Sequence, residues 1–216
     1  MGDRAAAIHP GRVLQCFDHF VIDLRGAASA AAYFTVYAVE YSPDLGTGHV
    51  AFLRTRDAGG VELDLTFTDA EGLAGRMQAR LRGIAATTSI SRGIGTSLEQ
   101  RALSARFQRH PWTEEGVGWT IAADGGPTVE ARWRQPEEPI WTAAMAGTFT
   151  SERDILGMLA GFGAADLRLD GHPVEGEPWL DPWWERRVGR PFSSTHVALA
   201  EASLTPAPRF WDGVRG

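Results

Sequence analysis

The sequence places one carboxylate in an unusual setting, because Asp18 lies within the apolar stretch VLQCFDHFVIDL at residues 13–24. This stretch has the composition of a buried strand, and strict alternation puts Asp18 on the same side as Phe20 and other apolar residues. A carboxyl group buried without a partner has a raised pKa and can exchange a proton near neutral pH. Glu40, near the end of the aromatic stretch at residues 33–41, is a second catalytic candidate. Either carboxylate can instead pair with one of the 21 arginines.

Aromatic side chains supply candidates for contact with an apolar ligand. Four prolines, at 173, 178, 182 and 191, interrupt a tryptophan-rich segment, which we expect to be an ordered excursion that covers the open end of a barrel or sandwich. A cover of this kind is also a wall of any cavity beneath it. The candidate ligand-binding residues are Tyr33, Tyr37, Trp119, Trp133, Trp141, Trp179, Trp183 and Trp184.

The six histidines show none of the short spacings of HExxH or HxH metal sites. FDHFVIDL at residues 17–24, followed by an alanine-rich stretch and by GGVELDL at 59–65, resembles the first module of the glyoxalase and extradiol dioxygenase superfamily. In that superfamily a first-strand histidine and a last-strand glutamate bind a divalent metal, so the resemblance implies His19 and Glu62 as ligands. The alternative is that His19 is a hydrogen-bonded strand histidine.

Nucleophilic catalysis has weaker support in the sequence. There is no GxSxG motif, and the hydroxyls and imidazole of Ser193 to His196 are too close in the chain for a catalytic triad. We expect these hydroxyls to bond backbone groups where the last strand begins. The glycine-containing stretch SRGIGTS at residues 91–97 is a flexible connection or a place for an anion to bind.

The composition excludes several classes of function. The net charge of −6 disfavours nucleic acid as a partner, since phosphate contacts need a basic face. The chain contains no lysine, which excludes Schiff-base catalysis, a pyridoxal phosphate anchor and a P-loop. Cys16 is the only cysteine, so no intrachain disulfide forms. We find no apolar run long enough for a membrane span and no signal-peptide pattern, and we expect a cytoplasmic protein.

The order of predicted elements favours an α+β fold that is predominantly antiparallel β. Strands are expected at 13–24, 33–41, 49–56, 61–68, 102–110, 116–123, 128–135, 139–149, 165–169 and 195–204, and helices at 69–83 and 151–162. Thr68 and Glu71 are the expected capping box of the first helix. Nine or ten strands in consecutive hairpins form a closed barrel or a sandwich, lipocalin-like in architecture.

We expect a single domain in which two segments resemble each other in sequence. TFTDAEGLAGRM at 66–77 and TFTSERDILGML at 148–159 each run from a strand end toward an apolar helix. This similarity predicts two related β-rich halves, about 12–84 and 100–204, joined by a polar loop at 85–99. The alternative is that the similarity arises by chance, because strand ends and helix caps use the same few residue types.

Three functions fit these features. The first is a cofactor-independent cyclase or isomerase of specialised metabolism that acts on an apolar or aromatic molecule by acid–base catalysis. The second is a non-catalytic carrier or sensor of a hydrophobic ligand, which predicts that an arginine neutralises Asp18 and that no proton donor faces the ligand. The third is an interaction module that displays Trp183 and Trp184, which predicts self-association as a homodimer. The metal-dependent glyoxalase-like protein is a further alternative.

Overall fold

The computed structural model describes residues 13–26, 30–42, 44–56, 62–84, 98–144 and 154–203. The strands are β1 (Val13–Arg25), β2 (Ala30–Tyr41), β3 (Gly48–Arg56), β4 (Glu62–Thr68), β5 (Leu103–Thr113), β6 (Gly116–Ala123), β7 (Thr128–Pro136), β8 (Ile140–Ala144), β9 (Asp154–Leu169), β10 (His172–Pro173) and β11 (His196–Ser203). The helices are α1 (Leu73–Ile84) and α3 (Pro182–Val188).

Nine of the described strands close into a mixed β-barrel, in the order β9-β11-β1-β2-β3-β4-β5-β6-β7 and back to β9. All of the pairings are antiparallel except β4 with β5, which are parallel over Phe67–Leu103 and Thr68–Ser104. Parallel neighbours need a crossover connection, and α1 lies in the chain between these two strands. The barrel confirms the predicted fold class and decides between barrel and sandwich.

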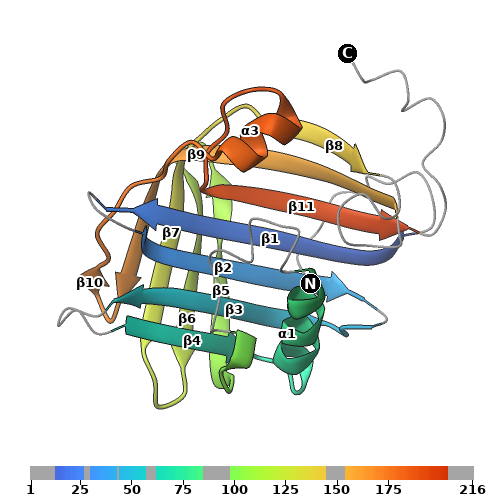
Figure 1. Ribbon diagram of the computed structural model, residues 1–216. Coiled ribbons are helices and arrows are strands. Elements are labelled where there is room, and N and C mark those ends of the chain that lie inside the picture. The colour runs from blue at the N-terminus through green and yellow to red at the C-terminus, as the bar shows by residue number, and fades with distance from the viewer. Residues whose placement is uncertain are drawn as a thin grey trace.

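Figure 1 shows two layers of strands that cross at a steep angle. The strands β11, β1, β2, β3 and β4 run across the front of this view, and β5, β6 and β7 cross behind them. Strand β9 belongs to both layers, because residues 154–161 pair with β11 and residues 162–169 pair with β7. This one long strand therefore closes the barrel.

The barrel interior is filled by apolar side chains that alternate along each strand. Phe20, Ile22 and Leu24 of β1 face inward, as the sequence pattern predicts, and pack with Trp119 and Trp133 from the opposite layer. A second apolar cluster lies on the outer face, where Leu73, Met77 and Leu81 of α1 pack against β2 and β3. These three helical residues are the apolar stripe that the sequence predicts.

The predicted helix at 151–162 is wrong, because residues 154–169 form strand β9. Ile155, Leu156, Leu159 and Phe162 mimic a helical stripe by spacing alone. In the strand, the residues of β9 in the interior cluster are Ala160 and Phe162 before Gly163, and Leu167 after it, so the inward-facing register changes within the strand. The two similar segments therefore differ in structure, because residues 73–77 lie in helix α1 and residues 154–159 lie in strand β9. The predicted connection at 85–99 lies mostly outside the described residues, and residues 145–149 of the predicted strand 139–149 lie entirely outside them.

The second helix of the fold is α3, within the tryptophan-rich segment. Asp181 caps its N-terminus by accepting a hydrogen bond from the Trp183 backbone N–H at 2.8 Å, and Pro182 starts its first turn. Gly189 ends it in the left-handed conformation. Prolines limit this segment as predicted, but they leave room for a helix of 7 residues. Neither described helix has the length and apolar character needed to cross a membrane.

Trp133 tests how far the interior depends on a single polar contact. Its buried indole donates a hydrogen bond to the Val21 backbone oxygen at 2.7 Å, which ties the two layers together. We expect Trp133→Phe to lower the free energy of unfolding by about 2–4 kcal/mol, because it removes this buried hydrogen bond and opens a cavity. Chemical denaturation measures the loss. The control is Trp141→Phe, since Trp141 is 58% exposed, and equal losses for the two variants would contradict the assignment.

Candidate functional site

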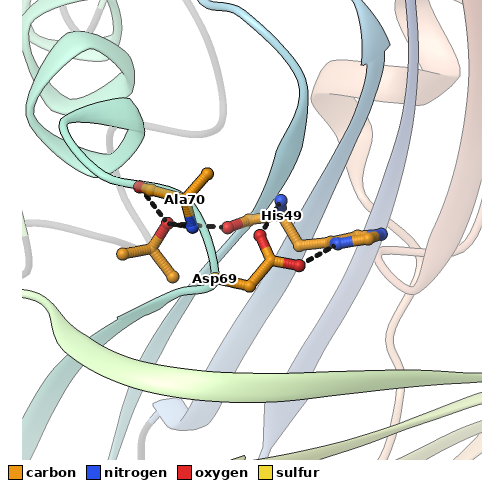
Figure 2. Close-up of polar contacts among 4 residues, drawn as sticks. His49, Asp69 and Ala70 are labelled. Carbon is orange, nitrogen blue, oxygen red and sulfur yellow. Dashed lines mark hydrogen bonds and ion pairs between the residues drawn. The ribbon is translucent and has the colours of Figure 1, made fainter.

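The start of β3 carries a histidine, His49, that is paired with a carboxylate. His49 lies on the inner face of β3, in the same alternation as Ala51 and Leu53. Its backbone oxygen accepts hydrogen bonds from the Thr68 hydroxyl at 2.9 Å and from the Asp69 backbone N–H at 3.4 Å. The Thr68 hydroxyl also accepts from the Ala70 backbone N–H at 3.3 Å. The end of β4 thus holds the start of β3 in place (Figure 2).

Asp69 binds both the backbone and the side chain of His49, as Figure 2 shows. One carboxylate oxygen accepts from the His49 backbone N–H at 2.7 Å, and the other contacts Nδ1 of the imidazole at 2.6 Å. A carboxylate at Nδ1 stabilises the tautomer with its proton there, which leaves the lone pair on Nε2. No group among the described residues bonds Nε2, and the two side chains are 32% and 30% exposed. This His49–Asp69 pair, called the dyad below, is a solvent-accessible base.

Gly48 permits this arrangement. Its φ of +136° is rare for residues with side chains, and a Cβ added there would lie 2.7 Å from the Ala70 Cβ and 2.9 Å from Oδ1 of Asp69. The backbone of β3 therefore approaches the turn before α1 more closely than any other residue type allows. The carboxylate reaches His49 because of this approach.

The imidazole of His49 lies against aromatic rings from the opposite layer. It stacks on Phe107 of β5 with ring centroids 5.2 Å apart and contacts Trp119 of β6 edge-on at 5.3 Å. Trp119 in turn contacts Phe20 of β1 at 5.5 Å. The dyad is thus at the edge of an apolar, aromatic surface, on which flat ligands stack favourably.

Asp18 is buried and ion-paired. Nη1 of Arg109 donates to its carboxylate at 3.0 Å, and the guanidinium also lies over the Phe20 ring at 5.0 Å. The side chain of Asp18 is 3% exposed and that of Arg109 is 37% exposed. Of the two sequence-based alternatives for Asp18, the arginine pair is the one that the structure forms.

The dyad and the Asp18–Arg109 pair occupy the same part of the barrel. Asp18 is in register with Ala38 of β2, and Ala38 is in register with His49 of β3. Two strand spacings separate the two polar groups by about 10 Å, with only a methyl side chain between them. Glu40, the other predicted catalytic carboxylate, is exposed near the end of β2.

The predicted ligand-binding residues divide between the two faces of the barrel. Trp119 and Trp133 lie inside, as alternation predicts. Tyr33 and Tyr37 lie outside, in the cluster beneath α1, so they do not share the interior with those tryptophans. Burial raises the pKa of the Tyr37 hydroxyl. Trp141 is largely exposed on β8.

The tryptophans of the C-terminal segment also lie outside the barrel interior. Trp184 contacts His196 on the outer face of β11 at 4.9 Å and meets Trp183 edge-on at 4.7 Å. Arg187 covers the Trp183 ring at 3.3 Å, and Arg25 covers the Trp179 ring at 3.2 Å. These rings cover the wall of the barrel, whereas the sequence pattern predicts a cover over its end.

His19 and Glu62, the implied metal ligands, are not brought together. His19 is in register with Tyr37 of β2, and the row continues through Val50 to Thr68 of β4. Glu62 lies six residues from Thr68, about 20 Å along the strand. It is exposed and pairs with Arg56 at 3.5 Å. The described residues contain no group of three or more potential metal-ligating side chains.

His19 instead forms a buried cluster with His196 on the outer face. Its Nε2 bonds the Thr35 hydroxyl at 2.8 Å, and its ring stacks on Tyr37 at 4.2 Å. Burial lowers the pKa of His19 well below its usual value, and the nearby His196 lowers it further. Burial also lowers the pKa of His196 to about 4, although the Ser194 carbonyl and Asp181 oppose this effect. Both rings are therefore neutral at pH 7, as a strand histidine in a hydrogen-bonded core should be.

Four residues of the site are not predicted by the sequence patterns: His49, Asp69, Phe107 and Arg109. A signal for the first two is present, because residues 49–56 and 61–68 are expected to pair as a hairpin, which brings their outer ends together. No local pattern places Phe107 or Arg109 beside them.

The chain matches no protein-family model and no curated protein.

Gly48→Ala tests the close approach that forms the dyad. We expect it to lower the free energy of unfolding by about 2–4 kcal/mol, because the new Cβ adds a collision to an unfavourable φ. Gly125→Ala is the control, since Gly125 has a φ of +69° and a Cβ added there would meet no atom within 4 Å. The control should lose about 1 kcal/mol in chemical denaturation. Equal losses of unfolding free energy in the two variants would show that collision with Ala70 and Asp69 does not destabilise the protein.

The buried histidines make stability depend on pH. Their folded-state pKa values lie below the unfolded value of about 6.5, so the unfolded chain takes up protons first and stability is lost as the pH falls from 6.5 toward the folded values. Each histidine should contribute a loss of about 1.4 kcal/mol per pH unit. Unfolding measured between pH 7 and 5 should show a shallower slope for His196→Phe. His172→Gln, at an exposed position, should leave the slope unchanged. An unchanged slope in His196→Phe would contradict the prediction.

Proposed function

We propose that the protein binds a small apolar or aromatic molecule beside the dyad and moves a proton within it, as a cofactor-independent isomerase or cyclase. The observation that carries this proposal is the geometry of His49, whose Nε2 is unbonded among the described residues and solvent-accessible next to the rings of Phe107 and Trp119. A β-barrel with this feature on its inner face is compatible with a ligand-binding protein.

The dyad has the parts that a general base requires. Asp69 holds the Nδ1 proton, so the Nε2 lone pair points away from the carboxylate. When Nε2 takes a proton from a substrate carbon, the carboxylate stabilises the imidazolium that forms. Return of that proton to another carbon completes an isomerisation. In a cyclisation, the carbanion attacks a carbonyl carbon of the same molecule, the C=O π pair moves onto oxygen, and that oxygen takes the proton from Nε2. Neither route needs an external oxidant or reductant.

Asp18 and Arg109 have a different part in this proposal. The guanidinium lies 3.0 Å from the Asp18 carboxylate and forms an ion pair with it, so we assign Asp18 no proton transfer. The pair is neutral overall, and the Arg109 side chain is 37% exposed, so a polar atom of a ligand can meet the guanidinium beside the Phe20 ring. Asp18 is accordingly a positioning residue for Arg109.

A non-catalytic carrier is the second candidate, and the Asp18–Arg109 pair favours it. The carrier hypothesis expects an arginine to neutralise Asp18, and also expects no proton donor to face the ligand. The first expectation agrees with the ion pair. His49 weighs against the second expectation, because its Nε2 on the inner face can take up a proton and return it, and for this reason we favour the enzyme.

A model proton abstraction separates these two functions. 5-Nitrobenzisoxazole is a flat aromatic compound that loses its ring C–H proton to a base as its N–O bond breaks, which gives the coloured 2-cyano-4-nitrophenolate. We expect the wild-type protein to accelerate this reaction, His49→Gln to lower the rate by about 100-fold, and Asp69→Asn by about tenfold or more. Absorbance of the phenolate measures the rate.

His172→Gln is the matched control, because His172 is exposed and distant in sequence from the dyad, and its rate should equal that of the wild type. Binding is followed in parallel by the fluorescence of 8-anilinonaphthalene-1-sulfonate. Ligand binding with equal rates in wild type and His49→Gln would overturn the enzyme in favour of the carrier. Absence of both binding and rate would overturn the proposed function as a whole.

A further inference from the structure

Trp119 carries a polar atom that its surroundings do not satisfy. Its side chain is 2% exposed, and its Nε1 is buried without a hydrogen-bond partner in the part of the chain that the structure describes. Trp133 provides a direct comparison, because it lies in the same interior cluster and donates its indole proton to the Val21 oxygen at 2.7 Å. Leaving a buried donor unpaired costs about 1–3 kcal/mol, so such a group calls for an explanation.

The surroundings of Trp119 are aromatic. Its ring contacts Phe20 at 5.5 Å, His49 at 5.3 Å and Phe107 at 6.4 Å. These rings offer its N–H at most a weak interaction with a π face. Of the three, His49 and Phe107 are partly exposed, so Trp119 contacts the dyad and one further ring that solvent reaches.

We propose that Nε1 of Trp119 donates a hydrogen bond to an oxygen atom of the bound molecule, which makes the ligand class flat conjugated compounds that carry a carbonyl group beside the ring. This inference rests on the proposed function and specifies its substrate class. Trp119 is then the residue that distinguishes oxygen-bearing ligands from hydrocarbons of the same shape.

The inferred contact suits the chemistry of the dyad. When Nε2 of His49 removes a proton from the carbon beside a carbonyl group, the C–H electron pair forms a C–C double bond and the carbonyl π pair moves onto oxygen. The indole N–H then faces an enolate, to which a hydrogen bond is stronger than to the neutral carbonyl. Return of the proton from His49 to another carbon of the conjugated system restores the carbonyl group and leaves an isomer. Trp119 thus binds the substrate and stabilises its intermediate.

A pair of probes of equal shape tests the inference. 2-Acetylnaphthalene has a carbonyl group where 2-isopropenylnaphthalene has a C=CH₂ group. We expect the wild type to bind the ketone about tenfold more tightly, which corresponds to about 1.4 kcal/mol, and Trp119→Phe to bind the two equally. Displacement of 8-anilinonaphthalene-1-sulfonate measures both affinities. Trp112→Phe, at a tryptophan 39% exposed, is the control and should keep the tenfold preference.

A spectroscopic measurement on the wild type keeps the test independent of whether Trp119→Phe folds. Addition of the ketone should move one indole N–H proton resonance downfield, and addition of the hydrocarbon should not. Three results would each overturn the inference while leaving the proposed function intact. They are equal wild-type affinities for the two probes, a preference for the ketone that persists in Trp119→Phe, and indole resonances that do not shift when the ketone is added. Failure of both probes to bind the wild type would count against both.

Discussion

The fold depends on β9 pairing with strands on both sides. Its first half hydrogen-bonds to β11 and its second half to β7, so the front layer of strands is joined to the layer behind it. Closure removes the open edges that these layers would otherwise present. It also sets the two inner faces against each other, and this is why Arg109 reaches Asp18 and Phe107 reaches His49 across the interior. The candidate site is a product of closure as much as of its own residues.

Local patterns predict most of the strands, because stretches of alternating apolar and polar side chains, separated by turn residues, indicate a half-buried sheet. The failure at β9 has a physical cause. Ile155, Leu156, Leu159 and Phe162 follow a helical spacing, but the glycines and the change of inward face near Gly163 serve a strand that joins two layers. A strand that switches register has no fixed period to detect. Its secondary structure is determined by pairing with strands that are distant in the chain.

The candidate site shows the same limit. Asp18 is recognisable from its apolar neighbours, whereas its partner Arg109 is 91 residues away and indistinguishable from the other arginines by local sequence. The dyad is easier to predict, since His49 starts the first strand of a predicted hairpin and Asp69 follows the second. Strands β3 and β4 pair from Val50–Thr68 to Arg56–Glu62, and this register brings His49 beside Asp69, the residue that follows β4.

The parallel contact between β4 and β5 has a further consequence. It spans Phe67–Leu103 and Thr68–Ser104, whereas β1 and β2 are paired from Cys16 to Arg25. Among the described residues this is therefore the shortest ladder of the ring, and it adjoins Thr68 and Asp69. Thermal fluctuations separate the shortest ladders first. Under the proposed function, an opening of the wall at this ladder would lie beside the base and would leave intact the longer ladders that join the other described strands of the ring.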